Sequence, residues 1–327
     1  MFIQIIILLI ALVVLVWSAD KFVLGASSLA RNVGVSPMII GLTIVAMGSS
    51  APEMMVAATA AWQGNPDTAI GNAIGSNITN IALVLGITVL IKPLMVSSSI
   101  IKKELPFVLV LSIASYWLLY DNNFGFYEAL ALFIGFFLFI FTLLIRALKQ
   151  NKNKPIDDPM LIEAEQELPD ATSTPISFMW LILGLILLVA SAHFLVQSAV
   201  YIATAFGISD LVIGLTVIAI GTSLPELAAS IASVMKKEHD LALGNIIGSN
   251  IFNLLAVLPF AGLMAPGSIN PEAVTRDIPI MIGLTLLLLI LCFSRKSGFF
   301  RITRVKGALL LACFIAYQFL LFSQIGR

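Results

Sequence analysis

Two glutamate residues, Glu53 and Glu226, each directly follow a proline inside a long apolar run. They lie in near-copies of one segment, GLTIVAMGSSAPEM from Gly41 and GLTVIAIGTSLPEL from Gly214, which agree at eight of fourteen positions. A charged side chain at membrane depth costs about 3 kcal/mol on insertion scales, so such residues usually mark functional sites. Two carboxylates at equivalent positions supply the charge that one divalent cation needs. The pair therefore predicts a cation site at the seam between two repeats.

The two prolines are expected to add oxygen ligands to this site. Pro52 cannot donate a hydrogen bond to the carbonyl of Gly48, and Pro225 cannot donate one to the carbonyl of Gly221. Lipid cannot satisfy these carbonyls, so an unwound helix persists only against protein or a water-lined cavity. Carbonyl oxygens are ligands for calcium and sodium. One proline kink would favour a structural role, but two kinks that each precede a glutamate favour a binding site.

A second motif repeats at the same spacing of 173 residues. GNAIGSNITNI from Gly71 and GNIIGSNIFNL from Gly244 agree at eight of eleven positions. In GSNIxN the serine and the last asparagine are four residues apart and share a helix face. The expected neutral oxygen ligands from both motifs are Ser49, Ser50, Ser76, Asn80, Thr222, Ser223, Ser249 and Asn253. The first asparagine, Asn77 or Asn250, is expected to hydrogen-bond to a neighbouring helix. Close helix packing is expected at Gly71, Gly75, Gly244 and Gly248.

The composition is that of a protein solvated by lipid. The 327 residues are 59% hydrophobic and 11% charged, and the mean hydropathy is +1.04. Soluble domains carry about 25% charged residues. The 18 basic and 18 acidic residues give no net charge, so nothing indicates a nucleic-acid partner. Cys292 and Cys313 lack ligand-like spacing and are expected to be packing residues.

The sequence predicts an all-α membrane protein with ten transmembrane helices, arranged as two five-helix repeats. We expect the first repeat at residues 1–148, a cytoplasmic acidic linker at 149–175 and the second repeat at 176–327. The linker holds six of the 18 acidic residues. Such a segment is expected to be a solvated connection rather than a regulatory calcium site. The ten expected spans are 2–30, 36–62, 67–91, 104–120, 125–147, 176–205, 209–235, 240–263, 277–294 and 303–323.

The basic residues predict the orientation of the chain. Sixteen of the 18 fall on the cytoplasmic side if the N-terminus faces out, as the positive-inside rule requires. Five spans per repeat then insert the second repeat with inverted topology and leave both termini outside. At the same spacing Gly125-Phe126 aligns with Gly298-Phe299, and Asp20 aligns with His193. For Asp20, local pairing with Lys21 is favoured over a proton relay or gate. His193 is expected to be an ordinary polar residue.

The paired G-[ST]-S-x-P-E and G-S-N-I-x-N motifs resemble those of the calcium/cation antiporter superfamily, the sodium/calcium exchangers, in a bacterial-type member. This resemblance extends over all ten expected helices. It implies a calcium site made by Glu53 and Glu226 with the carbonyls of Ser49 and Thr222. It also implies sodium sites that use Ser50, Ser76, Ser223, Ser249 and the carbonyls of Ala46 and Ala219. The chain departs from many relatives at Asn253, where they have aspartate, so potassium dependence and ion stoichiometry stay open.

Together with these patterns, the resemblance implies a secondary active antiporter that expels calcium against entering sodium through one site with alternating access. Its expected partners are calcium ions, sodium ions and the lipid bilayer. No cofactor, enzymatic activity or oligomer is required, and the expected location is a plasma membrane or bacterial inner membrane. The alternative on the same scaffold is a cation/proton antiporter, since two glutamates can carry protons. An intramembrane protease is disfavoured because such dyads use aspartate. A passive channel, which would conduct without a counter-ion, stays an alternative, whereas the doubled polar motif argues against a purely structural membrane protein.

Overall fold

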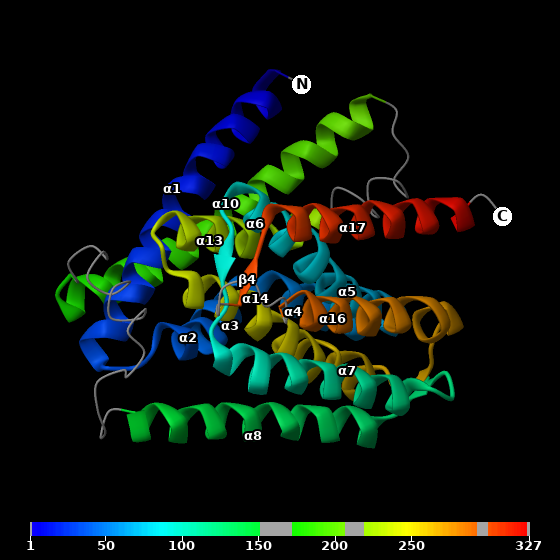
Figure 1. Cartoon of the computed structure of the whole chain (residues 1–327). Helices are drawn as coiled ribbons and strands as arrows, with labels where there is room; N and C mark the ends of the chain where they lie inside the picture. The colour runs from blue at the N-terminus through cyan, green and yellow to red at the C-terminus, as the bar shows by residue number, and fades with distance from the viewer. Residues whose placement is uncertain (1, 151–171, 207–218, 293–299, 326–327) are drawn as a thin grey trace. The chain divides into compact units, whose positions relative to one another are not determined.

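The computed structural model describes residues 2–150, 172–206, 219–292 and 300–325, and nearly all of them are helical (Figure 1). Most of the expected acidic linker and the start of the expected seventh span lie outside the described residues. The chain is an integral membrane protein by the length and apolar character of its helices.

The described elements divide into two series along the chain. Helices, π-helical turns (η) and strands of the first series are α1 (Phe2–Val33), α2 (Pro37–Ile40), η1 (Gly41–Val45), α3 (Ala46–Ser49), α4 (Ala51–Trp62), α5 (Pro66–Thr79), η2 (Asn80–Val84), α6 (Leu85–Ile91), β1 (Leu94–Met95), η3 (Ile100–Glu104), α7 (Leu105–Leu119), β2 (Asn123–Phe124) and α8 (Phe126–Gln150). Those of the second are α10 (Thr174–Ala205), α12 (Ala219–Thr222), α13 (Leu224–Met235), α14 (His239–Phe252), η5 (Asn253–Val257), α15 (Pro259–Met264), β3 (Gly267–Ser268), η6 (Ala273–Asp277), α16 (Ile278–Cys292), β4 (Arg301–Ile302) and α17 (Arg304–Ile325).

The two series repeat one another at the spacing found in the sequence. Helices α4, α5 and α7 have the same lengths as α13, α14 and α16, and each begins 173 residues before its counterpart. The π-helical turns η2 and η3 recur in the same way as η5 and η6. Even the turns that follow α4 and α13 agree, because Gly64 has a φ of 74° and Lys237 a φ of 65°. The duplication therefore sets backbone conformation as well as side-chain identity.

Two short antiparallel strand pairs correct the expected alignment near the end of each half. Phe124 in β2 pairs with Gly267 in β3, and Leu94 in β1 pairs with Ile302 in β4. Because β1 and β3 are equivalent, the partners Phe124 and Ile302 are also equivalent, and they lie 178 residues apart. The predicted match of Gly125-Phe126 with Gly298-Phe299 is therefore wrong by five residues, which the second half inserts before α17.

Seven described helical stretches are long and apolar enough to cross a membrane, or eight with the bent pair formed by residues 37–49 and 51–62. These correspond to eight of the ten expected spans. The expected fourth span coincides with η3 and α7, whose run from Ile100 to Leu119 carries Lys102, Lys103 and Glu104 near its start. In the expected seventh span, the described part consists of α12 and α13.

The chain forms two compact units, and each combines segments from both halves. The first comprises Met1–Ala51 and Phe137–Gly248. Helix α1 packs against α10 in this unit (Figure 1). Phe22, Val23 and Leu188 are fully buried in its core. Gly25 and Gly184 set the distance between these helices. A Cβ atom at Gly184 would lie 2.6 Å from the backbone nitrogen of Phe22, and one at Gly25 would lie 2.7 Å from the carbonyl oxygen of Ser177. Glycine is therefore required at both contacts.

The second unit comprises Pro52–Phe136 and Ser249–Arg327. Helix α6 packs against α17 through a matched glycine pair. A Cβ atom at Gly307 would lie 2.9 Å from the carbonyl oxygen of Gly86, and one at Gly86 would lie 3.2 Å from the carbonyl oxygen of Gly307. Arg304 donates to the carbonyl oxygen of Leu90 at 2.9 Å and so caps the C-terminus of α6. These contacts hold the end of one series against the middle of the other.

A buried carboxyl in the connection between α13 and α14 makes stability depend on pH. Glu238 is 5% exposed and lies 3.7 Å from Arg31 of α1. Burial raises the pKa of Glu238 above its ordinary value; Arg31, Ser27 and Lys236 lower it without cancelling this effect, and Asp240 raises it. The folded protein therefore holds this proton more tightly than the unfolded chain does. The contribution of Glu238 to stability is complete below its unfolded pKa and is lost as the pH rises through the folded pKa.

We therefore expect the Tm of Glu238→Gln to increase relative to the Tm of the wild type as the pH rises from about 4.5 towards neutrality. The amide cannot ionise, so the variant avoids the cost of the buried negative charge. Thermal unfolding of both proteins in detergent across this pH range measures the difference. A Tm difference that stays constant, or that falls with increasing pH, contradicts this assignment.

Candidate cation site

Both predicted helix breaks occur, and they occur at equivalent serines. Ser50 lies between α3 and α4 with φ −83° and ψ 8°, and Ser223 lies between α12 and α13 with φ −90° and ψ 8°. These angles fall in the sparsely populated bridge region, which is common in active sites. Pro52 and Pro225 follow two residues later, where each lacks the backbone donor that would continue the preceding helix. The sequence motif thus interrupts a membrane helix in the same way twice.

Within the first unit, the break of the first half lies beside the glutamate of the second half. The Ser50 hydroxyl donates to Glu226 Oε1 at 2.9 Å. Ser50 and Glu226 are both 0% exposed, so water does not screen this contact. A carboxylate and a hydroxyl from the two motifs therefore share one buried environment, as a common oxygen site requires.

The other predicted ligands of the first unit are grouped along the same two broken helices. Ser49 and Ser223 are buried, and Thr222 is half-buried. Ala46 begins α3 and Ala219 begins α12, so each stands one turn before its break. The Ala46 carbonyl accepts the backbone N–H of Ser50 at 3.0 Å and the Ser49 hydroxyl at 3.4 Å. Ser223 Oγ has no hydrogen-bond partner in the part of the chain that the structure describes.

The second unit holds the remaining predicted ligands, and all of them are buried. Glu53 is 1% exposed in the first turn of α4. Ser76 lies on α5 and Ser249 on α14, and both are buried. The two site asparagines, Asn80 and Asn253, each begin a π-helical turn, η2 and η5 respectively. Such widened turns are frequent at functional sites, which agrees with a ligand role for both.

Amide groups of the two GSNIxN motifs meet inside this second unit. Asn253 Nδ2 donates to Asn77 Oδ1 at 3.1 Å, and Asn77 Nδ2 contacts Met281 Sδ of α16 at 3.4 Å. Asn77 is therefore an interhelical hydrogen-bonding residue, as expected. By contrast, neither amide atom of Asn80 has a hydrogen-bond partner among the described residues, although Asn80 is 1% exposed. A buried amide without partners is costly unless a ligand or ion satisfies it.

Close helix packing is confirmed at the two glycines of the second copy. A Cβ atom at Gly244 would lie 2.8 Å from the carbonyl oxygen of Met38, and one at Gly248 would lie 2.6 Å from Ala46 Cβ. For Gly71 and Gly75 no described atom lies within 4 Å of such a Cβ. The equivalent partner segment around Gly214 lies outside the described residues.

The side chains lining the candidate site are suited to hard cations. No group of three or more His, Cys, Asp or Glu side chains able to hold a metal occurs in the described residues. The grouped atoms are instead carboxylate, hydroxyl, amide and carbonyl oxygens, which calcium and sodium accept and which softer transition metals do not prefer.

Two asparagines that are not among the predicted ligands contact the motif glutamates. Asn72 donates to the carbonyl oxygen of Glu53 at 2.9 Å, and Asn245 donates to the carbonyl oxygen of Glu226 at 3.4 Å. Both occupy the second position of the G-N-x-I-G-S-N motif. Their identical place in the two copies is the signal in the sequence that marks them.

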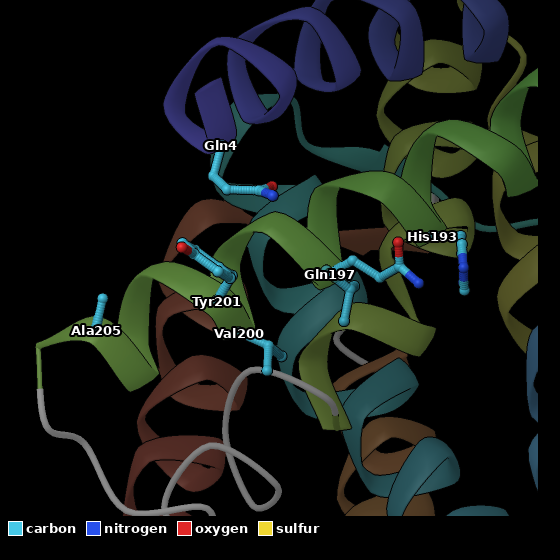
Figure 2. Close-up of a pocket in the computed structure, with 7 residues that line it drawn as sticks. Gln4, His193, Gln197, Val200, Tyr201 and Ala205 are labelled. Atoms are coloured by element: carbon cyan, nitrogen blue, oxygen red, sulfur yellow. The ribbon is translucent and has the colours of Figure 1, made fainter. Parts of the chain in front are cut away.

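Asp20 and His193, which align in the two halves, lie in different surroundings. Asp20 Oδ1 lies 2.5 Å from Lys236 Nζ, whereas Asp20 Oδ2 lies 3.7 Å from Lys21 Nζ. The expected local pair with Lys21 therefore exists, but a contact to the α13–α14 connection is shorter. His193 lines an open cavity of about 810 Å³ together with Gln4 and Gln197 (Figure 2). Neither residue contacts the motif glutamates in the interactions described.

Comparison with known proteins identifies the family. The model of the sodium/calcium exchanger protein family matches residues 3–145 and 176–323. The chain belongs to this family. It is 55% identical over 324 residues to the putative antiporter CaxA of Alkalimonas amylolytica, covering 99% of this chain and 100% of that protein. It is 30% identical to the sodium/calcium exchanger MaX1 of Methanosarcina acetivorans, with 97% of each chain covered.

The fold also matches solved structures of an exchanger. The structure of the sodium-calcium exchanger NCX_Mj soaked with 2.5 mM Na⁺ and 0.1 mM Ca²⁺ has a TM-score of 0.79 and 32% sequence identity, covering 96% of this chain and 97% of the other. The chain is therefore a calcium/cation antiporter by family, with a mostly helical membrane fold. The inner membrane protein YrbG of Escherichia coli (strain K12) is 39% identical over 96% of the chain. This family consists of transporters and not of enzymes.

Proposed function

We propose that this antiporter expels calcium in exchange for entering sodium, through one central site that Glu53 and Glu226 share. The observation that carries the proposal is the buried hydrogen bond from Ser50 to Glu226 Oε1. It links the carboxylate of one motif copy to the helix break of the other, which a site at the repeat seam requires. The printed names of MaX1 and NCX_Mj as sodium/calcium exchangers favour sodium as the counter-ion.

In this proposal the calcium ligands are the two glutamates and the carbonyls of Ser49 and Thr222. The sodium ligands are Ser50, Ser76, Ser223 and Ser249 with the carbonyls of Ala46 and Ala219, and Asn80 and Asn253 complete the polar shell. Calcium and sodium compete because both need the same carboxylates. An empty site with two negative charges resists movement through a low dielectric, so exchange is favoured over leak.

The proposed architecture is ten helices in two inverted five-helix repeats, at residues 1–148 and 176–327, joined by a cytoplasmic linker at 149–175. Both termini lie outside, in a plasma membrane or a bacterial inner membrane. The tight glycine contacts between α1 and α10 support their movement as one body. This movement would expose the site alternately to each side.

Calcium-45 flux into proteoliposomes with defined ion gradients tests the exchange. We expect vesicles loaded with sodium to accumulate calcium when diluted into sodium-free buffer, and potassium-loaded vesicles to accumulate none. A pH gradient without sodium should drive no uptake. Uptake driven by the pH gradient alone would show that protons, and not sodium, are the counter-ion. Unitary currents in planar bilayers would show that the protein is a channel and not an antiporter.

A further inference from the structure

We infer that Asn72 and Asn245 are positioning residues that fix the two motif glutamates for cation binding, an inference that rests on the proposed site. Each side-chain amide donates to the backbone carbonyl of the glutamate that lies 19 residues earlier in its own half. The two bonds are equivalent under the 173-residue repeat, yet each lies in a different compact unit. The same contact thus occurs in two separate packing environments.

The bonded carbonyls lie where a helix needs support. Glu53 and Glu226 stand in the first turns of α4 and α13, directly after the breaks at Ser50 and Ser223. A proline in each first turn removes a backbone donor, so this turn is held by fewer bonds than an uninterrupted helix. A donor from the neighbouring helix, α5 or α14, therefore fixes the Cα position from which each carboxylate extends. A ligand set that binds a dehydrated cation tolerates displacements of only about 0.5 Å.

Asn245 makes more hydrogen bonds than Asn72, because both ends of its amide are bonded. Its Oδ1 accepts the Ser49 hydroxyl at 3.0 Å, and its Nδ2 also contacts Ser230 Oγ at 3.2 Å. Asn245 is 0% exposed. One side chain therefore links the break of the first half to the glutamate of the second half. An aliphatic residue of the same size cannot make these bonds, and a carboxylate cannot donate them.

The two copies differ at the position of Ser230. Its equivalent in the first half is Ala57, which offers no hydroxyl to Asn72. Asn72 is half-buried, and the bond that the structure gives it is the one to the Glu53 carbonyl. Substitution of Asn72 thus removes mainly the bond to the Glu53 carbonyl, whereas substitution of Asn245 also removes the bonds to Ser49 and Ser230.

Calcium-dependent thermal stabilisation of the purified full chain tests the inference. The variants are Asn72→Leu and Asn245→Leu, with Ser233→Ala as matched control, since Ser233 is buried on α13 and its hydroxyl bonds to the Ala229 carbonyl of its own helix. A ligand raises the Tm according to its affinity for the folded state. Loss of a residue that orients ligands lowers metal affinity by about 10- to 100-fold. We expect both Leu variants to need at least about tenfold more calcium for half of the maximal Tm increase, and the control to need the wild-type concentration.

A purely structural role lowers the calcium-free Tm and leaves the calcium concentration at half-effect unchanged. That result in either folded variant overturns the inference. If Asn245→Leu does not fold, Asn72→Leu decides the outcome. Transport adds a second readout, in which the KM for calcium rises while the maximal rate stays within about twofold. Glu53→Gln and Glu226→Gln are measured alongside, and a wild-type calcium response in both of them overturns the proposed site itself.

Discussion

Glu53→Gln and Glu226→Gln are each expected to abolish sodium-driven calcium uptake. Each change removes one of two negative charges from a buried site while leaving the shape of the side chain. Removing one partner of a buried charge pair costs about 3–5 kcal/mol, which corresponds to more than a hundredfold in affinity. The measurement is initial calcium-45 uptake into sodium-loaded proteoliposomes, normalised to the amount of folded transporter.

A matched control for these variants is Glu128→Gln. Glu128 lies in the first turn of α8 and belongs to neither repeated motif. Calcium uptake by the Glu128→Gln variant should therefore equal that of the wild type. Uptake by either motif variant at more than about a tenth of the wild-type rate contradicts the shared site. Loss of uptake in only one of the two variants contradicts it as well, because the site needs both charges.

Gly25→Ala and Gly184→Ala are expected to destabilise the pairing of α1 with α10. The added methyl group at Gly184 would meet the backbone of Phe22, and the one at Gly25 would meet the backbone of Leu181 and Ser177. Backbone atoms cannot rotate away, so the helices must separate. Overpacking of this kind costs about 1–3 kcal/mol per site. We expect each variant to lower the Tm by several degrees, and the double variant to lose most of its folded fraction.

The control is Gly283→Ala on α16, where no described atom lies within 4 Å of the added Cβ. Alanine is the better helix former by about 1 kcal/mol, so this variant should be as stable as the wild type or more stable. Thermal unfolding in detergent, followed by size-exclusion chromatography, compares these variants with the wild type. Equal Tm values for Gly25→Ala and Gly283→Ala would show that the α1–α10 contact is not close.

Features fixed by residue chemistry could be read from the sequence alone. Pro52 and Pro225 predicted the two helix breaks because proline lacks the donor that a continuous helix needs. The 173-residue spacing predicted equal elements in both halves. The contact between Ser50 and Glu226 within one buried environment agrees with the prediction that the two halves contribute to one site, although the meeting of both glutamates stays a prediction.

Features fixed by geometry could not be read in this way. The π-helical turns at Asn80 and Asn253 depend on the hydrogen-bond register of the backbone, which leaves no trace in apolar periodicity. The five-residue insertion before α17 became visible through the strand partners Phe124 and Ile302. The role of Asn245 could not be predicted, because it depends on which helix lies beside it. Sequence spacing predicts the face of a helix, but not its neighbour.

The most direct test of the central claim is an experimental structure of the transporter with strontium or calcium bound. We predict one ion with carboxylate oxygens of both Glu53 and Glu226 at about 2.3–2.6 Å, a distance typical of calcium coordination. Carbonyl and hydroxyl oxygens from the breaks at Ser50 and Ser223 should complete the shell. An ion bound by one glutamate alone, or two glutamates that face separate surroundings, would contradict the account.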